Sequence, residues 1–172
     1  EIVIDNYQED RNPEKSEITS STNIGMQILS TISAYDLKIE ENAIDNLKNI
    51  LTTVENLKKW NGHLYNWYNL NKLEVVEPRE ISTVDSGNFV TTLYILKQFF
   101  IEQNEIELSN RVDKLIKKTD FSKLYNKEKK LFSIGYDCNK NELKKQCYDM
   151  LASESRQTSL VAIAKGDVEL SH

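Results

Sequence analysis

The chain is poor in the residues that interrupt helices. Its 172 residues include only 5 glycines and 2 prolines, whereas all-β sandwiches, barrels and disordered chains use many more of them in turns and linkers. Hydrophobic residues make up 39% and charged residues 28% of the sequence, which is sufficient for one core and a charged surface. We therefore expect a helix-rich chain with a single hydrophobic core.

Cysteine and histidine are also scarce, with 2 of each. Cys138 and Cys147 are too few and too irregularly spaced for a zinc knuckle or a disulfide framework, so we expect reduced thiols. We interpret His63, whose only fellow histidine is His172, as a hydrogen-bonded loop residue and not as a metal ligand. The sequence has no GxGxxG, GxxxxGK[ST], HExxH or GxSxG motif, and we predict neither a metal nor a cofactor.

An excess of positive charge is missing too. The net charge of -5 and the pI near 5.2 give no electrostatic reason to expect a nucleic-acid partner. The basic run at Lys127, Lys129 and Lys130 is diluted by Glu128 and is typical of a solvated helix end. No apolar run approaches the roughly 18 residues of a membrane helix, and no signal peptide opens the chain.

The two ends of the chain suggest a piece of a longer protein. It begins at Glu1 without an initiator methionine and stops at His172 without a tail-like composition. Residues 1–21 are polar and contain Pro13, and we expect them to precede a helical domain of residues 22–172.

Apolar residues recur every three or four positions in several segments, which is the period of an amphipathic helix. We expect an all-α fold of helical hairpins, which fits a bundle, a solenoid or an α/α barrel. Ser21 or Thr22 is the expected cap of the first helix. Leu131–Tyr136 reads as an isolated extended segment that does not imply a sheet. The expected helices cover residues 22–35, 42–59 (stopped by Asn61-Gly62), 85–103, 108–116 and 144–165.

The connection from Gly62 to about Thr83 follows no regular period and is far longer than the usual 4 to 6 residues. Its aromatic residues argue against disorder. Trp67 and Tyr68 offer flat faces on which a sugar ring could stack, and Asn66 offers an amide that could bind sugar hydroxyls. The alternative is that these rings only anchor the loop to the core.

Two groups of polar residues on predicted helices complete the candidate site, one at a helix start and one within the last helix. Residues 82–88 form a dense helix-start signal, and because one N-cap explains only one of them, we predict that Asp85 or Asn88 faces a pocket. Glu154 and Arg156 lie among small residues in the last predicted helix, where a charge is costly unless it is paired or faces water. Either they pair with polar loop groups or they line a cavity.

Four blocks of the sequence resemble one known family. These are TNIG (22–25), GHLYNWYNLNKLEVVEPREISTVDSGN (62–88), LFSIGYD (131–137) and LASESRQTSLVAIAKGD (151–167). In this order they resemble the central, glucoamylase-like region of cyclic β-1,2-glucan synthases. The chain departs from the family pattern at Asn69, where Asp is usual, and at Ser155, where Ala is usual.

The resemblance implies the N-terminal portion of an (α/α)6 toroid, incomplete in this chain. It implies a retaining transglycosylase that closes linear β-1,2-glucan into rings, with the catalytic acid/base and nucleophile downstream of His172. Alternatives are an inverting β-1,2-glucanase-like hydrolase and a non-catalytic helical protein-binding module.

The implied partners are a β-1,2-glucan oligosaccharide and the remaining barrel and membrane-bound modules of a parent protein, on the cytoplasmic side of an inner membrane. We also expect self-association through an apolar flank left exposed. The matching pocket-wall residues are Asn66, Trp67, Tyr68, Asp85, Ser86, Asn88, Glu154 and Arg156.

Overall fold

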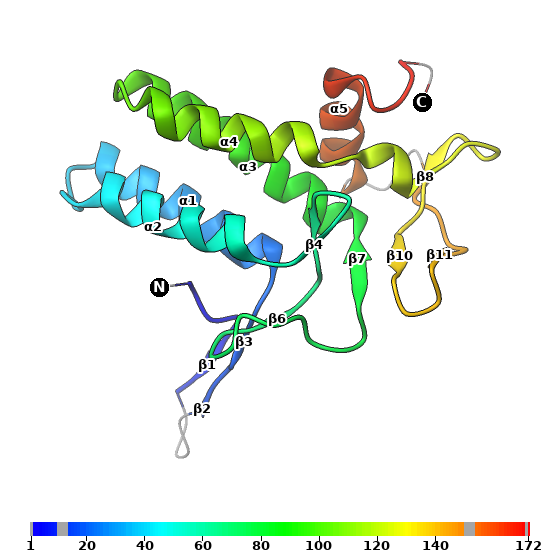
Figure 1. Cartoon of the computed structure of the whole chain (residues 1–172), viewed down its shortest axis with the longest axis horizontal. Helices are drawn as coiled ribbons and strands as arrows, with labels where there is room; N and C mark the ends of the chain where they lie inside the picture. The colour runs from blue at the N-terminus through cyan, green and yellow to red at the C-terminus, as the bar shows by residue number, and fades with distance from the viewer. Residues whose placement is uncertain (1, 10–13, 150–153, 171) are drawn as a thin grey trace.

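The computed structural model describes residues 2–9, 14–149, 154–170 and 172, and helices dominate this part of the chain (Figure 1). Each long helix except the last is joined to a neighbour as a hairpin. The helices are α1 (Ser21–Asp36), α2 (Ala43–Asn56), α3 (Thr83–Glu102), α4 (Ile106–Lys118), the 3-10 helix η1 (Phe121–Leu124) and α5 (Ser155–Lys165).

Short antiparallel strands occupy the connections between the helices. They form a three-stranded sheet in the order β11-β10-β7 and the pairs β1–β2, β3–β6, β4–β5 and β8–β9. The all-α prediction is therefore confirmed for the helices but has to be corrected for the connections. The strands are β1 (Tyr7–Gln8), β2 (Glu14–Lys15), β3 (Ile18–Thr19), β4 (Lys59–Trp60), β5 (His63–Leu64), β6 (Tyr68–Asn69), β7 (Glu80–Ser82), β8 (Tyr125–Asn126), β9 (Leu131–Phe132), β10 (Gly135–Asp137) and β11 (Glu142–Leu143).

The starts of α1 and α3 follow the same rule, a serine in extended conformation just before the helix. Ser20 Oγ accepts a hydrogen bond from Asn23 N at 3.1 Å, and Ser82 Oγ accepts one from Asp85 N at 3.2 Å. These bonds satisfy amides that have no partner inside the helix. The predicted cap at Ser21 or Thr22 is thus one or two residues too late.

The end of α2 also differs from the prediction. The helix ends at Asn56, and Asn61-Gly62 instead forms the turn between β4 and β5, with φ of 46° and 84°. A Cβ on Gly62 would lie 2.2 Å from Lys118 O. Glycine is required at this position by both the left-handed backbone and the close approach of α4's last carbonyls.

The last predicted helix, 144–165, is about twice as long as the helix in the structure. Residues 144–149 are not helical, because their backbone groups bond to the strand before them: Lys144 N donates to Gly135 O at 2.9 Å and Tyr148 N to Phe132 O at 2.9 Å. Residues 150–153 lie outside the described residues, and α5 begins at Ser155. The extended segment at Leu131–Tyr136 is confirmed, but it does belong to a sheet, because β10 pairs with β7 and β11.

The packing of the helices follows from contacts near their N-termini. Thr22 of α1 donates to Asp85 of α3, and the backbone at Gly25 faces Thr92, so α1 and α3 run in the same direction. On the other side of α3, Thr158 Oγ1 of α5 donates to Thr83 O at 3.2 Å. The N-terminal ends of α1, α3 and α5 therefore lie at one end of the molecule, above the strands in Figure 1.

The core lies between these helices and the strand-rich connections. Most of the predicted apolar stripes are buried, and helix α2 buries Leu47, Ile50, Leu51 and Val54 as expected. Within the described residues, no helix is long and apolar enough to cross a membrane. The largest fully buried side chains are Tyr68, Phe100, Phe121, Phe132, Ile24, Ile28, Leu47, Leu51, Ile81, Leu93, Leu96 and Leu124.

Candidate functional site

The connection between α2 and α3 is folded back on itself and largely hydrogen-bonded. Asn66 N donates to Glu80 O at 2.9 Å, and Trp67 O accepts from Val76 N at 3.0 Å. Asn66 Oδ1 is buried without a hydrogen-bond partner in the described part of the chain. The side chain of Trp67 is only half-buried, so among the aromatic residues predicted to contact sugar, Trp67 retains an accessible surface.

Tyr68 requires a correction. Its side chain is 0% exposed, and its hydroxyl donates to Lys58 O at 2.7 Å and accepts from Tyr65 N at 2.8 Å. Burial raises the pKa of this hydroxyl far above its ordinary value. Tyr68 cannot offer a ring face to a ligand in this structure, because it is a core residue that fixes the loop to the end of α2.

His63 is buried in the same connection, and its hydrogen bond agrees with the interpretation from sequence. Its Nε2–H donates to Asp120 O at 3.0 Å, and its ring packs edge-on against Phe121. Burial lowers the pKa of His63 to about 4, so the ring is neutral near pH 7. No group of three or more His, Cys, Asp or Glu side chains suited to a metal ion occurs among the described residues.

The first turns of α3 bring one carboxylate to the surface and bury one hydroxyl. Asp85 is half-buried, and one of its oxygens accepts the hydroxyl of Thr22. Ser86 is 4% exposed, and its Oγ has no partner within the described residues. Asn88 is half-buried. Asp85 and Asn88 are thus partly accessible, and whether either of them faces a ligand stays a prediction, whereas Ser86 is buried between helices.

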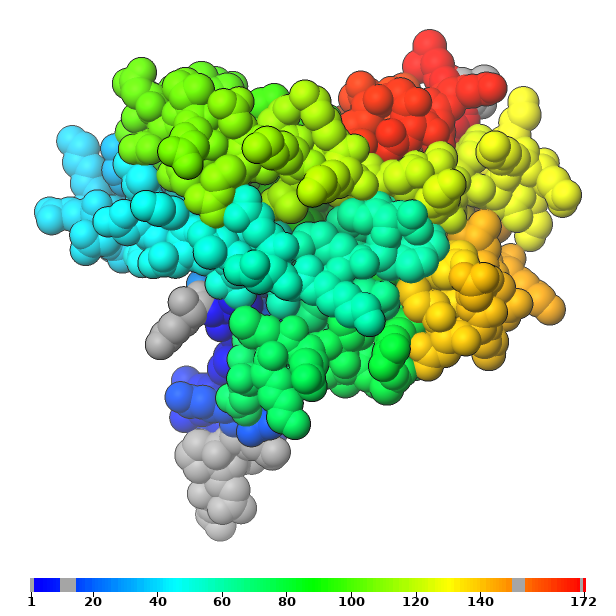
Figure 2. All heavy atoms as spheres, viewed as in Figure 1, coloured from blue at the N-terminus to red at the C-terminus, as the bar shows by residue number. Residues whose placement is uncertain are grey.

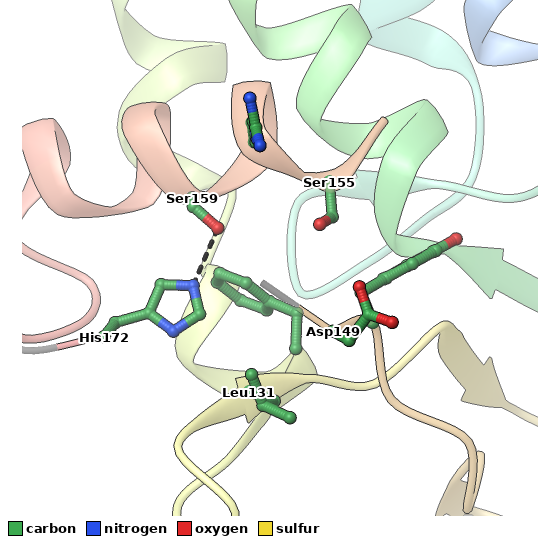
Figure 3. A pocket seen from close by; sticks show the side chains of 8 residues that line it. Leu131, Asp149, Ser155, Ser159 and His172 are labelled. Carbon is green, nitrogen blue, oxygen red and sulfur yellow. Dashed lines mark hydrogen bonds between the residues drawn. The ribbon is translucent and has the colours of Figure 1, made fainter. Parts of the chain in front are cut away.

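The start of α5 carries the remaining two predicted residues. Glu154 precedes the helix, is exposed, and makes no side-chain cap to it. Arg156 is exposed as well and lines a cavity of about 240 Å³. Figure 3 shows this cavity between the start of α5, with Ser155 and Ser159, and the chain at Leu131 and Asp149.

His172 borders the far side of the cavity. Its Nδ1–H donates to Lys130 O at 3.0 Å, which leaves Nε2 to accept the hydroxyl of Ser159 at 2.7 Å (Figure 3). The ring packs edge-on against Phe132, with centroids 4.9 Å apart. The cavity therefore has an apolar floor and a rim of hydroxyl, carboxylate and guanidinium groups.

Tyr148 connects the cavity with the carboxylates, and sequence reasoning missed it. It lines the cavity, and its backbone N–H is held by Phe132 O. Burial, and after it the charges of Glu154 and Asp85, raises the pKa of its hydroxyl. Both carboxylates thus act electrostatically on this phenol. Sequence reasoning missed Tyr148 because it fell inside the helix predicted over residues 144–165.

The structure thus joins some of the predicted residues and separates others. Asp85 and Glu154 both act electrostatically on Tyr148, and Tyr148 and Arg156 line the same cavity. Asn66 and Trp67 lie in the connection that supports the start of α3, and Tyr68 and Ser86 are buried. We use the term polar cluster for Thr22, Asp85, Tyr148 and Glu154.

Comparison with known proteins places this arrangement in context. No protein-family model matches the chain. The chain is similar to the cyclic β-(1,2)-glucan synthase NdvB of Rhizobium meliloti (strain 1021), with 26% identity over 298 residues that cover 98% of this chain and 10% of that protein. Because this chain has only 172 residues, the aligned part of the relative includes segments without a counterpart here. The chain spans about a tenth of the relative's length.

Solved structures share the fold. The endo-β-1,2-glucanase from Chitinophaga pinensis, in complex with sophorotriose and glucose, superposes with a TM-score of 0.76 and 18% identity over 87% of this chain and 37% of that one. A putative glucoamylase from Bacteroides caccae gives a TM-score of 0.76 and 14% identity over 87% of this chain and 38% of that one. At these identities the likeness shows the fold alone. Together with the relative matched over nearly the whole chain, it confirms the resemblance to cyclic β-1,2-glucan synthases that the four sequence blocks predicted.

Proposed function

We propose that the chain forms the first part of a barrel that acts on β-1,2-glucan. The observation that carries this proposal is the packing of the first turns of α3 and α5 against each other beside an accessible cavity lined by Tyr148 and Arg156. The charges of Glu154 and Asp85, which belong to these two helix starts, both act on the hydroxyl of Tyr148. The similarity to a protein named cyclic β-(1,2)-glucan synthase supplies the substrate class.

The chemistry of the polar cluster suits a neutral, hydroxyl-rich ligand. Carboxylates accept hydrogen bonds from sugar hydroxyls, and a phenol both donates and accepts. A pyranose ring also has an apolar face that stacks on aromatic side chains. Tyr148 lies at the cavity and can both form hydrogen bonds through its hydroxyl and stack through its ring. We propose that Trp67, which is also partly accessible, offers a second ring for stacking. Asn88 and Arg156 provide further polar contacts.

The reaction that we propose for the parent enzyme is retaining transglycosylation. A carboxylic acid protonates the glycosidic oxygen that leaves, while a carboxylate roughly 5 Å away attacks the anomeric carbon. A hydroxyl at the other end of the same glucan then displaces the enzyme carboxylate and closes the ring. We propose that both of these carboxyl groups belong to other parts of the parent polypeptide and that the present residues hold and orient the glucan.

Hydrolysis by inversion is the alternative, and the fold of the endo-β-1,2-glucanase favours considering it. The two reactions give different products from the same linear glucan. The full-length parent is incubated with linear β-1,2-glucan, and the products are analysed by mass spectrometry. We expect cyclic products, each lighter by one water than a linear glucan with the same number of glucose units. If only short linear products formed, the transglycosylation proposal would be wrong and hydrolysis would take its place.

The same reasoning extends to partners and location. We propose that the chain works together with the remaining barrel helices and membrane-bound modules of its parent, on the cytoplasmic side of an inner membrane. Three apolar side chains on the first, third and fifth helices are exposed: Met26 (60%), Ile95 (43%) and Leu160 (69%). We propose that these side chains belong to an apolar flank that favours self-association when no partner covers it. Sedimentation at rising concentration tests this point, and a monomer throughout would count against it.

Binding to the chain itself is the direct test. We expect β-1,2-gluco-oligosaccharides to bind in calorimetric titrations, and Glu154→Gln to weaken binding roughly tenfold, because a hydrogen bond to a charged group contributes about 1.5–3 kcal/mol. Glu41→Gln is the matched control, since it makes the same change at an exposed turn between α1 and α2.

Three results would contradict the proposal. One is the absence of binding to any β-1,2-linked oligosaccharide. Another is equal affinity for β-1,2- and β-1,3-linked oligosaccharides, which would leave the linkage unexplained. The third is an equal loss of affinity in the Glu154→Gln and Glu41→Gln variants. Binding of a protein partner through Trp67 without sugar binding would support a non-catalytic module instead.

A further inference from the structure

A second concave surface lies away from the polar cluster, where the C-terminal ends of α2 and α4 meet. On the face shown in Figure 2, the end of α2 and the yellow-green surface of α4 adjoin each other. Between them is a groove of about 560 Å³. We call it the basic groove, because its charged lining consists of Lys59, Arg111, Lys114 and Lys118 opposite a single acid, Glu55.

Two of the four cations already have partners. Arg111 forms a two-pronged ion pair with Glu55, with Nε–Oε1 and Nη2–Oε2 distances of 3.0 and 2.7 Å. Lys59 Nζ donates to Glu55 O at 3.1 Å and to Leu57 O at 2.9 Å. It thereby satisfies carbonyls at the end of α2 that have no partner inside the helix, but it forms no ion pair of its own within the described residues, and the nearby Glu55 is already paired with Arg111.

The other two cations are unpaired in the described part of the chain. Lys114 and Lys118 are one helical turn apart on α4, and neighbours at this spacing share a face. Two like charges at this spacing destabilise a helix slightly. The groove therefore concentrates three uncompensated ammonium groups in a protein whose net charge is -5.

The burial of Lys59 makes this concentration of charge more costly. Burial is the main cause that lowers the pKa of Lys59 to about 8, the charge of Glu55 opposes the effect, and the charge of Lys118 adds to it. An anion in the groove would offset the repulsion between the Lys59 and Lys118 ammonium groups. The arrangement thus favours a negatively charged occupant.

We propose that the basic groove binds an acidic polypeptide segment of a partner protein. The lysines extend along a turn of α4 and across to the end of α2, so they match several carboxylates placed along a chain. A lysine ammonium is a point charge without the two-pronged geometry that favours a single phosphate. This surface is independent of the glucan site, and its partner would attach to the outside of the barrel.

The test uses the chain and a fluorescent hexaglutamate peptide in anisotropy titrations. We expect binding at low salt that weakens as salt is added, and a loss of roughly tenfold in affinity for the Lys114→Glu/Lys118→Glu variant. The Lys127→Glu/Lys145→Glu variant makes the same change in net charge at exposed lysines elsewhere, and its affinity should fall less than half as far.

A second arm distinguishes a peptide from a free anion. Inorganic phosphate is titrated while the Lys59 ammonium is followed by NMR. Saturable binding of phosphate that is tighter than binding of the peptide would overturn the peptide proposal in favour of a small-anion site. Equal losses in the two double variants would show that only net charge matters and would overturn any proposal for this groove. Circular dichroism of each variant confirms that it is folded.

Discussion

One non-helical segment precedes α3 and another precedes α5, and the two segments behave in opposite ways. The connection before α3 contains both tryptophans and is mostly closed, since Tyr68 and His63 are buried and hydrogen-bonded. The segment before α5 contains as many Phe, Trp and Tyr residues, namely Tyr125, Phe132, Tyr136 and Tyr148. It places Tyr148 beside a cavity, where the charges of Glu154 and Asp85 act on its hydroxyl. The comparison shows that a high density of aromatic residues in a loop indicates packing at least as much as binding.

The closed segment is joined to the open one, because β7 at the end of the first pairs with β10 of the second. Thr83 Oγ1 donates to Ser133 O at 2.6 Å, and Ser133 N donates to Leu124 O at 3.0 Å. These two bonds attach Ser133 to the start of α3 and to the end of η1. The family-like blocks before α3 and at LFSIGYD thus act largely as structural supports, while the polar groups that remain accessible lie at the helix starts.

The largest expected effect concerns the closed segment. Tyr68→Ala should lower the free energy of unfolding by about 3–5 kcal/mol, the range for truncating a buried aromatic residue. Trp67→Ala should cost clearly less, because Trp67 is half-buried. Urea unfolding of both variants measures the difference. Equal costs would mean that the two neighbouring rings are packed alike, and the contrast between the closed and open segments would be lost.

The next effect is the pH dependence that His63 causes. The pKa of His63 is about 4 in the folded protein, against the ordinary histidine value of 6.5, so the unfolded chain binds a proton more readily. Stability from the neutral ring is fully present above pH 6.5 and is lost as the pH falls towards 4, by about 3 kcal/mol in total.

Unfolding experiments at pH 7 and pH 4 compare the wild type with His63→Gln. The variant should lose less stability between these two pH values, because the group that takes up the proton on unfolding is gone. His172→Gln serves as the control and should keep the pH dependence of the wild type. If His63→Gln kept it too, acid unfolding would have to originate from other groups.

The smallest effect concerns the open segment. Replacing both Asp85 and Glu154 by their amides should lower the pKa of Tyr148, because two nearby negative charges are removed. The pKa should stay above its ordinary value, since burial is the larger cause. NMR of ¹³C-labelled tyrosine measures the titration, and Tyr148→Phe assigns the signal. An unchanged pKa would show that the two carboxylates do not act on Tyr148, and the polar cluster would then not exist as defined.

Periodicity predicted the helices well where one face is buried. In α2 and α4 the buried residues recur at helical spacing, so the sequence alone placed both within a few residues. It failed for residues 144–149, because a bond such as that from Tyr148 N to Phe132 O depends on a neighbour that no local pattern reveals. Strands of two or three residues are likewise too short to show an alternating pattern.

Candidate site residues were predictable by type but not by exposure. Asp85, Asn88, Glu154 and Arg156 are polar residues near helix starts, and all four are accessible. The prediction for Tyr68 was wrong because its hydroxyl both donates to and accepts from backbone groups. The sequence does not distinguish such a tyrosine from one that faces a ligand. Only the positions of Lys58 and Tyr65 in space decide between the two.

Gly87 has a consequence for selectivity. A Cβ at this position would lie 1.9 Å from Thr158 Oγ1 and 2.8 Å from Thr158 Cα, so α3 and α5 touch with almost no side chain between them. Two helices in such contact shift together or not at all. The spacing between the first turns of α3 and α5 is then set by the two backbones, and we expect that a ligand bound beside them would not widen it.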